Sequence, residues 1–293
     1  MRGSSSIRRG FLACPLTVLL LAGGGPGPLR ASGHGPLFGL ATPTNGARAW
    51  SVDFGVMGRH GDAYTAAMVR AMASYGLTED VQISVSVPFV AASGPFAPGR
   101  MTGMMPATAD LEAVAAWRLH RRGTGVGRRI ESTVYGGLVA AGPQQPAGSP
   151  GGLSRAPGLY AAAATGMASR SHYLWIGGAV TRYAGDDDGN RRPSVLTYTA
   201  VWGYRPPAFR RDYPHWDWRL FVELTGERTS GARQDGVPIA DSSAHRVFLG
   251  PSILGIWKNH AVQAGLQVPI YRDAGSGFAR ERLRYAANYS RFF

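Results

Sequence analysis

The sequence predicts an all-β chain that closes into a single antiparallel barrel of about twelve strands and spans a membrane. Three observations favour this fold class. Apolar and polar residues alternate with a period of two in segments of about ten residues, the length that a tilted strand needs to cross a bilayer. Glycine is frequent, with 41 residues, and charged residues make up only 17% of the chain. Aromatic residues gather near expected strand ends, as in interfacial girdles.

The first 31 residues predict a secretory signal peptide. Arg2, Arg8 and Arg9 precede a short apolar run, and small residues up to Ala31 follow it. The run covers residues 11–22, which is too short for a membrane-spanning helix of about 20 residues. We therefore expect residues 1–31 to be a cleaved signal peptide, 32–49 a periplasmic N-terminal segment and 50–293 the barrel.

Cysteine content and charge narrow the class of protein further. Cys14 is the only cysteine, so a processed chain would hold neither a disulfide nor a thiolate metal site. The net charge of +13 could suggest nucleic acid, but exported proteins rarely meet it and the arginines are scattered. Anionic lipid head groups and lipopolysaccharide are the expected partners of this charge. An arginine-rich composition bias would explain it equally well.

In the first expected strand, Val52, Phe54 and Val56 alternate with polar or small residues. The alternation is equally clear at 81–89, 216–225 and 262–270, and it is weaker in the remaining segments. In chain order the expected strands cover residues 51–56, 64–75, 81–89, 109–120, 129–141, 158–169, 172–184, 194–204, 216–225, 244–257, 262–270 and 282–293.

The connections between these strands alternate in length. The first, third, fifth and later odd connections are generally long, for example residues 92–108 and 142–156. The even ones are mostly short, with residues 205–214 as the exception. Outer-membrane barrels have short periplasmic turns and longer external loops. An even strand number would place both termini on the periplasmic side.

A water-soluble β-sandwich or barrel, with its apolar face turned inward, is the competing fold. Strand length and a terminal Phe293 favour the membrane, as do aromatic residues at expected strand ends. The aromatic residues in question are Trp50, Tyr75, Trp175, Tyr204, Trp257 and Tyr271. In the last strand, Arg291 on the apolar face and Phe292 on the polar face break the alternation.

Three parts of the chain resemble a family of outer-membrane transporters associated with a meta-pathway of phenol degradation. They are HGPLFGL at 34–40, YGLTEDVQISVSVPFV at 75–90 and the closing aromatic strand. The resemblance covers most of the processed chain and implies a single barrel of about twelve strands in the outer membrane. It also implies that the barrel-assembly machinery reads the last strand, with Tyr285, Tyr289 and Phe293 as the signal. Arg291 and the loop at 92–108 depart from the family pattern.

The lumen is the expected functional surface, lined by charged and amide side chains on the polar faces of the strands. A barrel of this size predicts a narrow, partly obstructed pore, and a salt-bridged plug of Arg and Glu is the alternative. The expected lumen-lining residues are Asp53, Glu112, Arg118, Glu131, Arg219, Glu223, Glu227, Arg246, Gln263, Gln267, Arg282 and Arg284.

Three segments suggest metal binding, each beside a simpler interpretation. Cleavage after Ala31 would make His34 the third residue, a position that can bind Cu(II) or Ni(II); otherwise this segment packs against the periplasmic mouth. Residues 186–190 could hold Ca²⁺ but read more simply as a hairpin tip. The methionines within 101–105 could bind Cu(I), or belong to a loop that folds into the lumen. We expect no cofactor.

His172, His215, His245 and His260 lie near strand ends, but neither a Gly-x-Ser-x-Gly nor a His-Glu-x-x-His stretch accompanies them. We therefore expect no enzyme. The expected function is passive transport of small molecules across the outer membrane, aromatic or apolar ones among them. The alternatives are a structural or adhesive surface barrel with a closed lumen, or a metal-associated outer-membrane protein. Its partners would be lipid, lipopolysaccharide, the assembly machinery and a solute.

Overall fold

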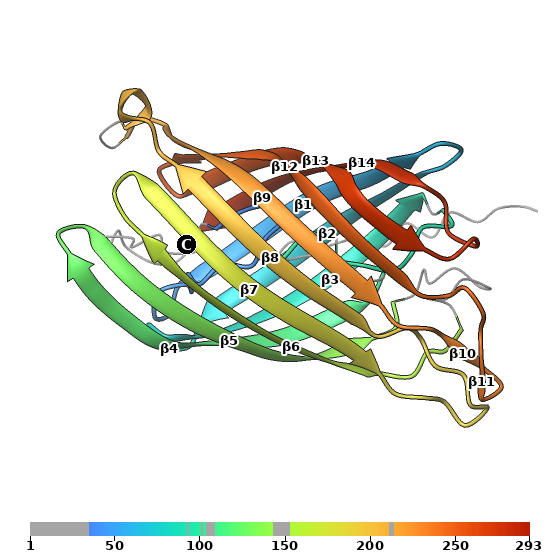
Figure 1. Cartoon of the computed structure of the whole chain (residues 1–293). Coiled ribbons are helices and arrows are strands. Elements are labelled where there is room, and N and C mark those ends of the chain that lie inside the picture. The colour runs from blue at the N-terminus through green and yellow to red at the C-terminus, as the bar shows by residue number, and fades with distance from the viewer. Residues whose placement is uncertain (1–34, 93, 101, 104–108, 143–152, 211–213) are drawn as a thin grey trace, which may run out of the picture.

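The computed structural model describes residues 35–92, 94–100, 102–103, 109–142, 153–210 and 214–293. Twelve long strands form a closed barrel in which each strand pairs antiparallel with its neighbours in sequence (Figure 1). The strands are β1 (Trp50–Gly61), β2 (Thr65–Gly76), β3 (Val81–Ala92), β4 (Leu111–Gly125), β5 (Arg128–Ala140), β6 (Gly158–Ala168), β7 (His172–Tyr183), β8 (Val195–Tyr204), β9 (Asp217–Thr229), β12 (Ala244–Trp257), β13 (His260–Ala274) and β14 (Glu281–Phe292). The predicted number and order of strands are confirmed.

Two small elements lie in the connections. A hairpin of β10 (Arg233–Gln234) and β11 (Val237–Pro238) interrupts the connection between β9 and β12. A single 3-10 turn, η1 (Pro207–Phe209), lies between β8 and β9. Among the described residues, no helix is long and apolar enough to cross a membrane.

Both ends of the strand series lie at one end of the barrel, which we call the terminal end. Trp50 and Phe293 exchange backbone hydrogen bonds there, at 3.3 and 2.9 Å. The short connections 77–80, 126–127, 169–171 and 258–259 lie at this end, together with the longer 205–216. The long connections lie at the opposite end, which we call the loop end (right in Figure 1). The predicted alternation of connection lengths is confirmed except at the first connection, residues 62–64, which is short.

The outer face of the barrel is apolar and the inner face is polar. On β1, Phe54 and Val56 are each 49% exposed, whereas Ser51 and Asp53 are buried. On β13, Leu266 and Val268 point outward in the same way. A water-soluble barrel would turn these apolar side chains inward, so the outer face is suited to a hydrocarbon environment. The arrangement is that of a transmembrane barrel.

Aromatic side chains ring the outer face near both ends. Near the terminal end, Trp216 stacks on Trp218 and Trp257, with ring centroids 5.3 and 6.0 Å apart. Near the loop end, the His245 ring lies 5.1 Å from that of Tyr271. Such rings suit the two membrane interfaces. Trp175, which we had expected in this girdle, instead points into the barrel and is only 2% exposed.

The β1–β14 seam closes the barrel, and one irregularity in it corrects a prediction. His60 pairs with Leu283, but the next β1 residue, Gly61, pairs with Glu281. This shift skips Arg282, so that Glu281 faces inward and Arg282 faces outward. The prediction that Arg282 lines the lumen is therefore wrong. Arg282 donates a hydrogen bond to Asp62, and that bond lowers the pKa of the Asp62 carboxyl.

Aromatic rings cover glycines of the neighbouring strand on the outer face. Tyr285 lies directly opposite Gly58 across the seam, and its ring occupies the space that a Cβ of Gly58 would need. Tyr198 covers Gly226, and Trp218 covers Gly255, in the same way. Tyr285, expected as part of an assembly signal, thus has a packing role in barrel closure.

Substituting Gly58 with alanine is expected to destabilise the barrel by about 1–3 kcal/mol, because the new methyl group displaces the Tyr285 ring. The heat-induced mobility change of the folded barrel on electrophoresis in detergent would give the midpoint of unfolding. Gly136→Ala is the matched control, since nothing lies within 4 Å of the added Cβ. Equal midpoints for the two variants would contradict a packing role for the ring.

Candidate functional site: the filled lumen

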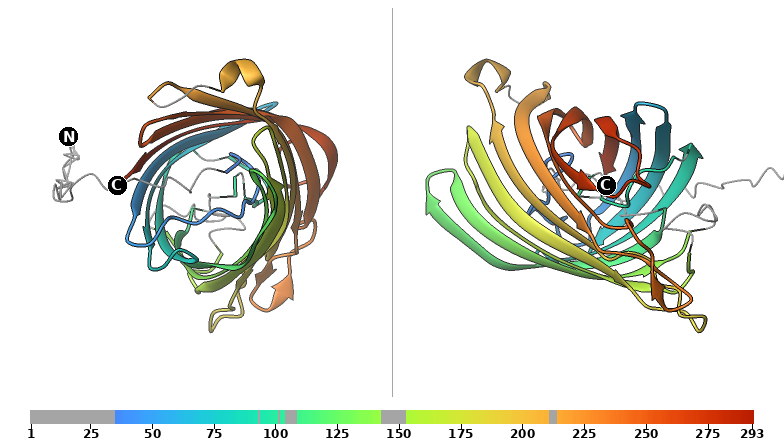
Figure 2. Two further views of the ribbon diagram at one scale, coloured as in Figure 1. Left: turned by 90° about the vertical axis from the view of Figure 1, so that its left-hand side faces the viewer. Right: turned by 45° about the vertical axis from the view of Figure 1, so that its right-hand side comes forward.

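The N-terminal segment lies inside the barrel. Residues 35–45, which we had expected on the periplasmic side of the membrane, run through the lumen (Figure 2, left). Leu37 and Phe38 are 2% and 1% exposed and pack against Met57 and Ala286 of the seam strands. The lumen therefore contains a stretch of main chain in addition to the strand side chains.

A single carboxylate on β9 holds the middle of this segment. Glu223 accepts hydrogen bonds from the backbone N–H groups of Leu37, Phe38 and Gly39, at 2.9, 2.7 and 2.7 Å. It also accepts one from the Ser252 hydroxyl. Among the described residues no salt bridge involves Glu223, so N–H and O–H donors solvate its charge. Such charge-assisted bonds are roughly twice as strong as neutral ones.

Further hydrogen bonds fix the two ends of the segment. Near its start, the Gln263 side chain donates to the Gly35 carbonyl at 2.7 Å. In the later part of the segment, the Trp175 indole N–H donates to Thr42 Oγ1 at 3.2 Å. The hydroxyl of Thr133 donates to the Thr42 carbonyl at 2.7 Å. The segment is thus bound along its length by strands on opposite sides of the lumen.

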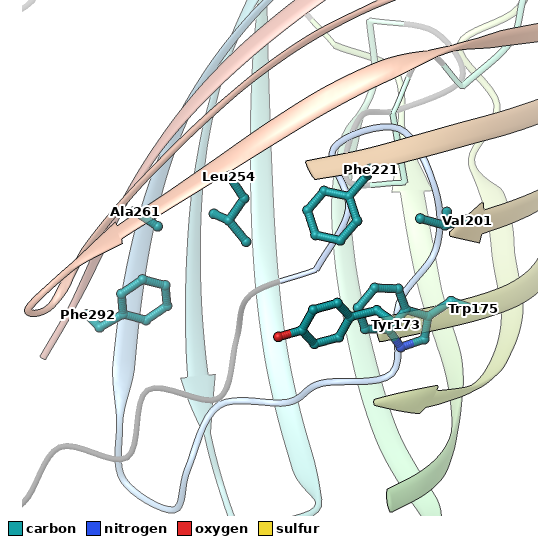
Figure 3. Close-up of a cluster of buried hydrophobic side chains, with 7 residues drawn as sticks. All are labelled: Tyr173, Trp175, Val201, Phe221, Leu254, Ala261 and Phe292. Carbon is teal, nitrogen blue, oxygen red and sulfur yellow. The ribbon is translucent and has the colours of Figure 1, made fainter. Parts of the chain in front are cut away.

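Apolar residues on the inner face form a cluster near the terminal end (Figure 3). Ala41 of the N-terminal segment packs against this cluster. Phe292, the aromatic residue that broke the alternation of the last strand, belongs to it and is 7% exposed. The cluster consists of Tyr173, Trp175, Val201, Phe221, Leu254, Ala261 and Phe292.

Part of the connection between β3 and β4 also enters the lumen, from the loop end. We call its described residues, 94–100 and 102–103, the inner loop. Ala97 is 1% exposed, and Arg100 forms a salt bridge with Glu112 on β4. The Thr229 hydroxyl on β9 donates to the Pro98 carbonyl at 2.7 Å. The inner loop thus fills the loop end of the lumen, as the N-terminal segment fills the terminal end.

An ion-pair network, which we call the arginine cluster, lies directly beneath the inner loop. Arg284 contacts Glu227 at 2.7 Å and Glu281 at 2.5 Å, and it is fully buried. Arg246 bridges the same two carboxylates, each at 3.0 Å. Arg59 lies 3.8 Å from Glu281. The guanidinium carbon of Arg284 also lies 3.5 Å from the centroid of the Phe248 ring.

Two further arginines form ion pairs at the lumen wall. Arg192 pairs with Asp110 at 2.6 Å, and both side chains are 0% exposed. Arg118 pairs with Asp80 at 2.8 Å and with Glu131 at 3.5 Å. Buried ion pairs therefore line the lumen wall, and main chain occupies part of the space between them.

Of the twelve side chains expected to line the lumen, all but Arg282 face inward. The sequence interpretation missed Arg70, which occupies an inward position of an expected strand, and Arg59, which lies beyond the expected strand 51–56 because β1 continues to Gly61. It also missed Asp110, which lies in the expected strand 109–120 in phase with Glu112, and Arg100 and Arg192, which lie in connections where no alternation marks a facing direction. The eleven that face inward are Asp53, Glu112, Arg118, Glu131, Arg219, Glu223, Glu227, Arg246, Gln263, Gln267 and Arg284.

A cavity of about 150 Å³ remains between the N-terminal segment and the wall formed by β1 to β6 with β13 and β14. Its lining includes the hydroxyl groups of Ser51, Ser74 and Ser84 and apolar or aromatic residues such as Leu40 and Tyr160. The charged residues Asp53, Arg100 and Glu112 also line it. This cavity is therefore amphipathic.

The described residues provide no candidate site for the metal ions considered above. Within the described parts of the chain, no group of three or more His, Cys, Asp and Glu residues could hold a metal ion. His34, Met101, Met104 and Met105 lie outside the described residues, as does the expected signal peptide. In the connection between β7 and β8, Asp186 accepts a hydrogen bond from the Asn190 backbone N–H at 2.8 Å, as in a hairpin tip.

No family model and no curated protein matches this chain. Among solved structures, an outer-membrane channel from Pseudomonas putida F1 is similar, with 15% identity and a TM-score of 0.60. The similarity covers 86% of this chain and 97% of that one. The NanC porin is 10% identical, with a TM-score of 0.49 over 82% of this chain and 98% of its own. At this level of identity the similarity shows the fold, that of an outer-membrane β-barrel.

Proposed function

We propose that this protein is an outer-membrane channel that passes small molecules passively. The observation that carries the proposal is the cavity of about 150 Å³ that remains beside the N-terminal segment in a barrel with an apolar outer face. A barrel that served only as a surface scaffold would have no need of a polar-walled space within it. The likeness in fold to an outer-membrane channel supports the same function.

The solutes are proposed to be small organic molecules with one apolar or aromatic face and one hydrogen-bonding group. The serine hydroxyls of β1, β2 and β3 can bond the polar group, while Tyr135, Tyr160 and Val114 contact the apolar face. Phenol-like molecules meet this description, in line with the resemblance noted in the sequence. Pore width and lining side chains would select among solutes.

The membrane orientation and the partners belong to the same proposal. With residues 1–31 removed on export, the terminal end would face the periplasm and the loop end the cell exterior. The last strand, with Tyr285, Tyr289 and Phe293, would be read by the barrel-assembly machinery. The outer face and the arginines at its borders would contact lipid and lipopolysaccharide.

Purified protein reconstituted in planar bilayers is expected to show discrete channel currents of low conductance, because the N-terminal segment and the inner loop leave only a narrow passage. Electrophoretic heat modifiability of the same preparation would show that the barrel is folded. A folded barrel that never conducts would contradict the channel and favour a surface barrel with a closed lumen.

A further inference from the structure

Among the described residues, the arginine cluster brings together three arginines and two carboxylates. The three arginines, Arg59, Arg246 and Arg284, pair with two carboxylates, Glu227 and Glu281. All five side chains are buried. A buried positive charge that lacks a counterion is costly unless strong acceptors surround it. The cluster therefore needs acceptors from elsewhere in the chain.

Backbone carbonyls of the inner loop provide these acceptors. Arg59 donates to the carbonyls of Ala97 and Gly99, both at 2.8 Å. Arg246 donates to those of Ala97 and Pro98, at 3.0 and 2.9 Å. Three consecutive carbonyl oxygens thus converge on two guanidinium groups. The side chains of the loop residues 97–99 carry no charge, so these contacts solvate the two guanidinium groups without neutralising them.

Close approach of the main chain makes this contact possible. A Cβ on Gly99 would overlap the Glu227 carboxylate and lie 2.7 Å from Arg246 Nη2. Neutral carbonyls are weaker acceptors for guanidinium groups than carboxylates, which can bind in a bidentate manner. A solute carboxylate would therefore be a better ligand for the two arginines than the loop that contacts them.

We propose that Arg59 and Arg246 form a binding site for the carboxylate group of a small organic anion, and that the carbonyls of residues 97–99 compete with the anion for it. Arg284 has a different role, because its contacts with both glutamates position the other two arginines. The inference rests on the proposed function, since a solute entering from the loop end meets the inner loop and then the cluster beneath it. The proposed site adds small organic anions to the solutes proposed above.

The first test measures binding in detergent by ¹⁹F NMR, with trifluoroacetate as the anionic probe and trifluoroacetamide as the neutral probe of similar shape. Trifluoroacetate is expected to show saturable line broadening with the full chain, and trifluoroacetamide none. Arg246→Gln should weaken trifluoroacetate binding by about tenfold or more. Arg118→Gln is the matched control, because it removes the same charge from an arginine that pairs with Asp80 and Glu131.

The second test uses the competition itself. Gly99→Ala adds a methyl group that forces the loop carbonyls away from Arg246 while leaving every charge in place. Trifluoroacetate should then bind about 3- to 10-fold more tightly, since the competing contact is weakened. A purely structural ion network would give no such gain. Gly136→Ala controls for added bulk in the barrel.

Three results would overturn the inference: equal binding of both probes, unchanged binding in folded Arg246→Gln, or unchanged or weaker binding in folded Gly99→Ala. Heat modifiability shows which variants are folded, and Gly99→Ala keeps the test decisive if Arg246→Gln does not fold. The NMR measurement does not depend on conductance. A silent bilayer with normal anion binding would therefore count against the channel alone, and currents without anion binding would count against this site alone.

Discussion

Glu223→Gln is expected to release the N-terminal segment from the lumen and to increase channel conductance. The substitution replaces a charged acceptor of three backbone N–H groups with a neutral amide. A loss of about 1 kcal/mol for each bond would raise the ratio of released to bound segment about 100-fold. Single-channel recording in planar bilayers would show this as a larger and more frequent open level.

Two further variants serve as references for this experiment. Deletion of residues 35–45 sets the conductance of the lumen without the segment, and Glu223→Gln should approach it. Thr199→Val removes one neutral bond, from the Leu40 backbone N–H at 3.2 Å, and should change the ratio by about tenfold or less. If the deletion variant conducts like the intact protein, the segment is not what obstructs the lumen.

Arg284→Met is expected to destabilise the barrel by about 3–5 kcal/mol, because it takes from two buried carboxylates the arginine that binds both of them most closely. Glu227 and Glu281 are 0% and 2% exposed, and Arg284 makes the shortest salt bridge to each of them within the arginine cluster. Unfolding in denaturant, followed by heat modifiability and by tryptophan fluorescence in detergent, would measure the change in the free energy of unfolding.

A second substitution separates charge balance from packing. Arg284→Met combined with Glu281→Gln removes one of the two carboxylates that have lost their closest partner, and it should restore part of the lost stability. Arg121→Met is the surface control: its side chain is 52% exposed, 3.7 Å from Glu131, and its loss should cost less than about 1 kcal/mol. A double variant no more stable than Arg284→Met would show that packing dominates.

The strand pattern could be predicted because it is local. Alternation along each segment, the spacing of the connections and the aromatic residues near strand ends are properties of neighbouring residues. They gave twelve strands in the observed order, and they gave the inward facing of residues such as Glu112 and Gln267. Alternation failed where the main chain departs from regular pairing, as at the bulge that turns Arg282 outward.

Phe292 and Trp175 illustrate a second limit. Both are aromatic residues in strands that the sequence predicts, and one of them was expected in the interfacial girdle. Both instead pack inside the barrel, in the cluster that Ala41 of the N-terminal segment also contacts. An inward aromatic residue is stable there only because a segment more than a hundred residues distant covers the cluster.

The sequence by itself therefore determined the barrel, the direction of its strands and most of the facing of their side chains. Only the tertiary structure decided what fills the lumen. Glu223 bonds N–H groups 184 to 186 residues away, and Arg246 bonds carbonyls 148 and 149 residues away. A two-residue period fixes the side of the sheet on which a residue lies. Its partner across the lumen depends on closure of the barrel, which brings distant strands and loops into one enclosed space.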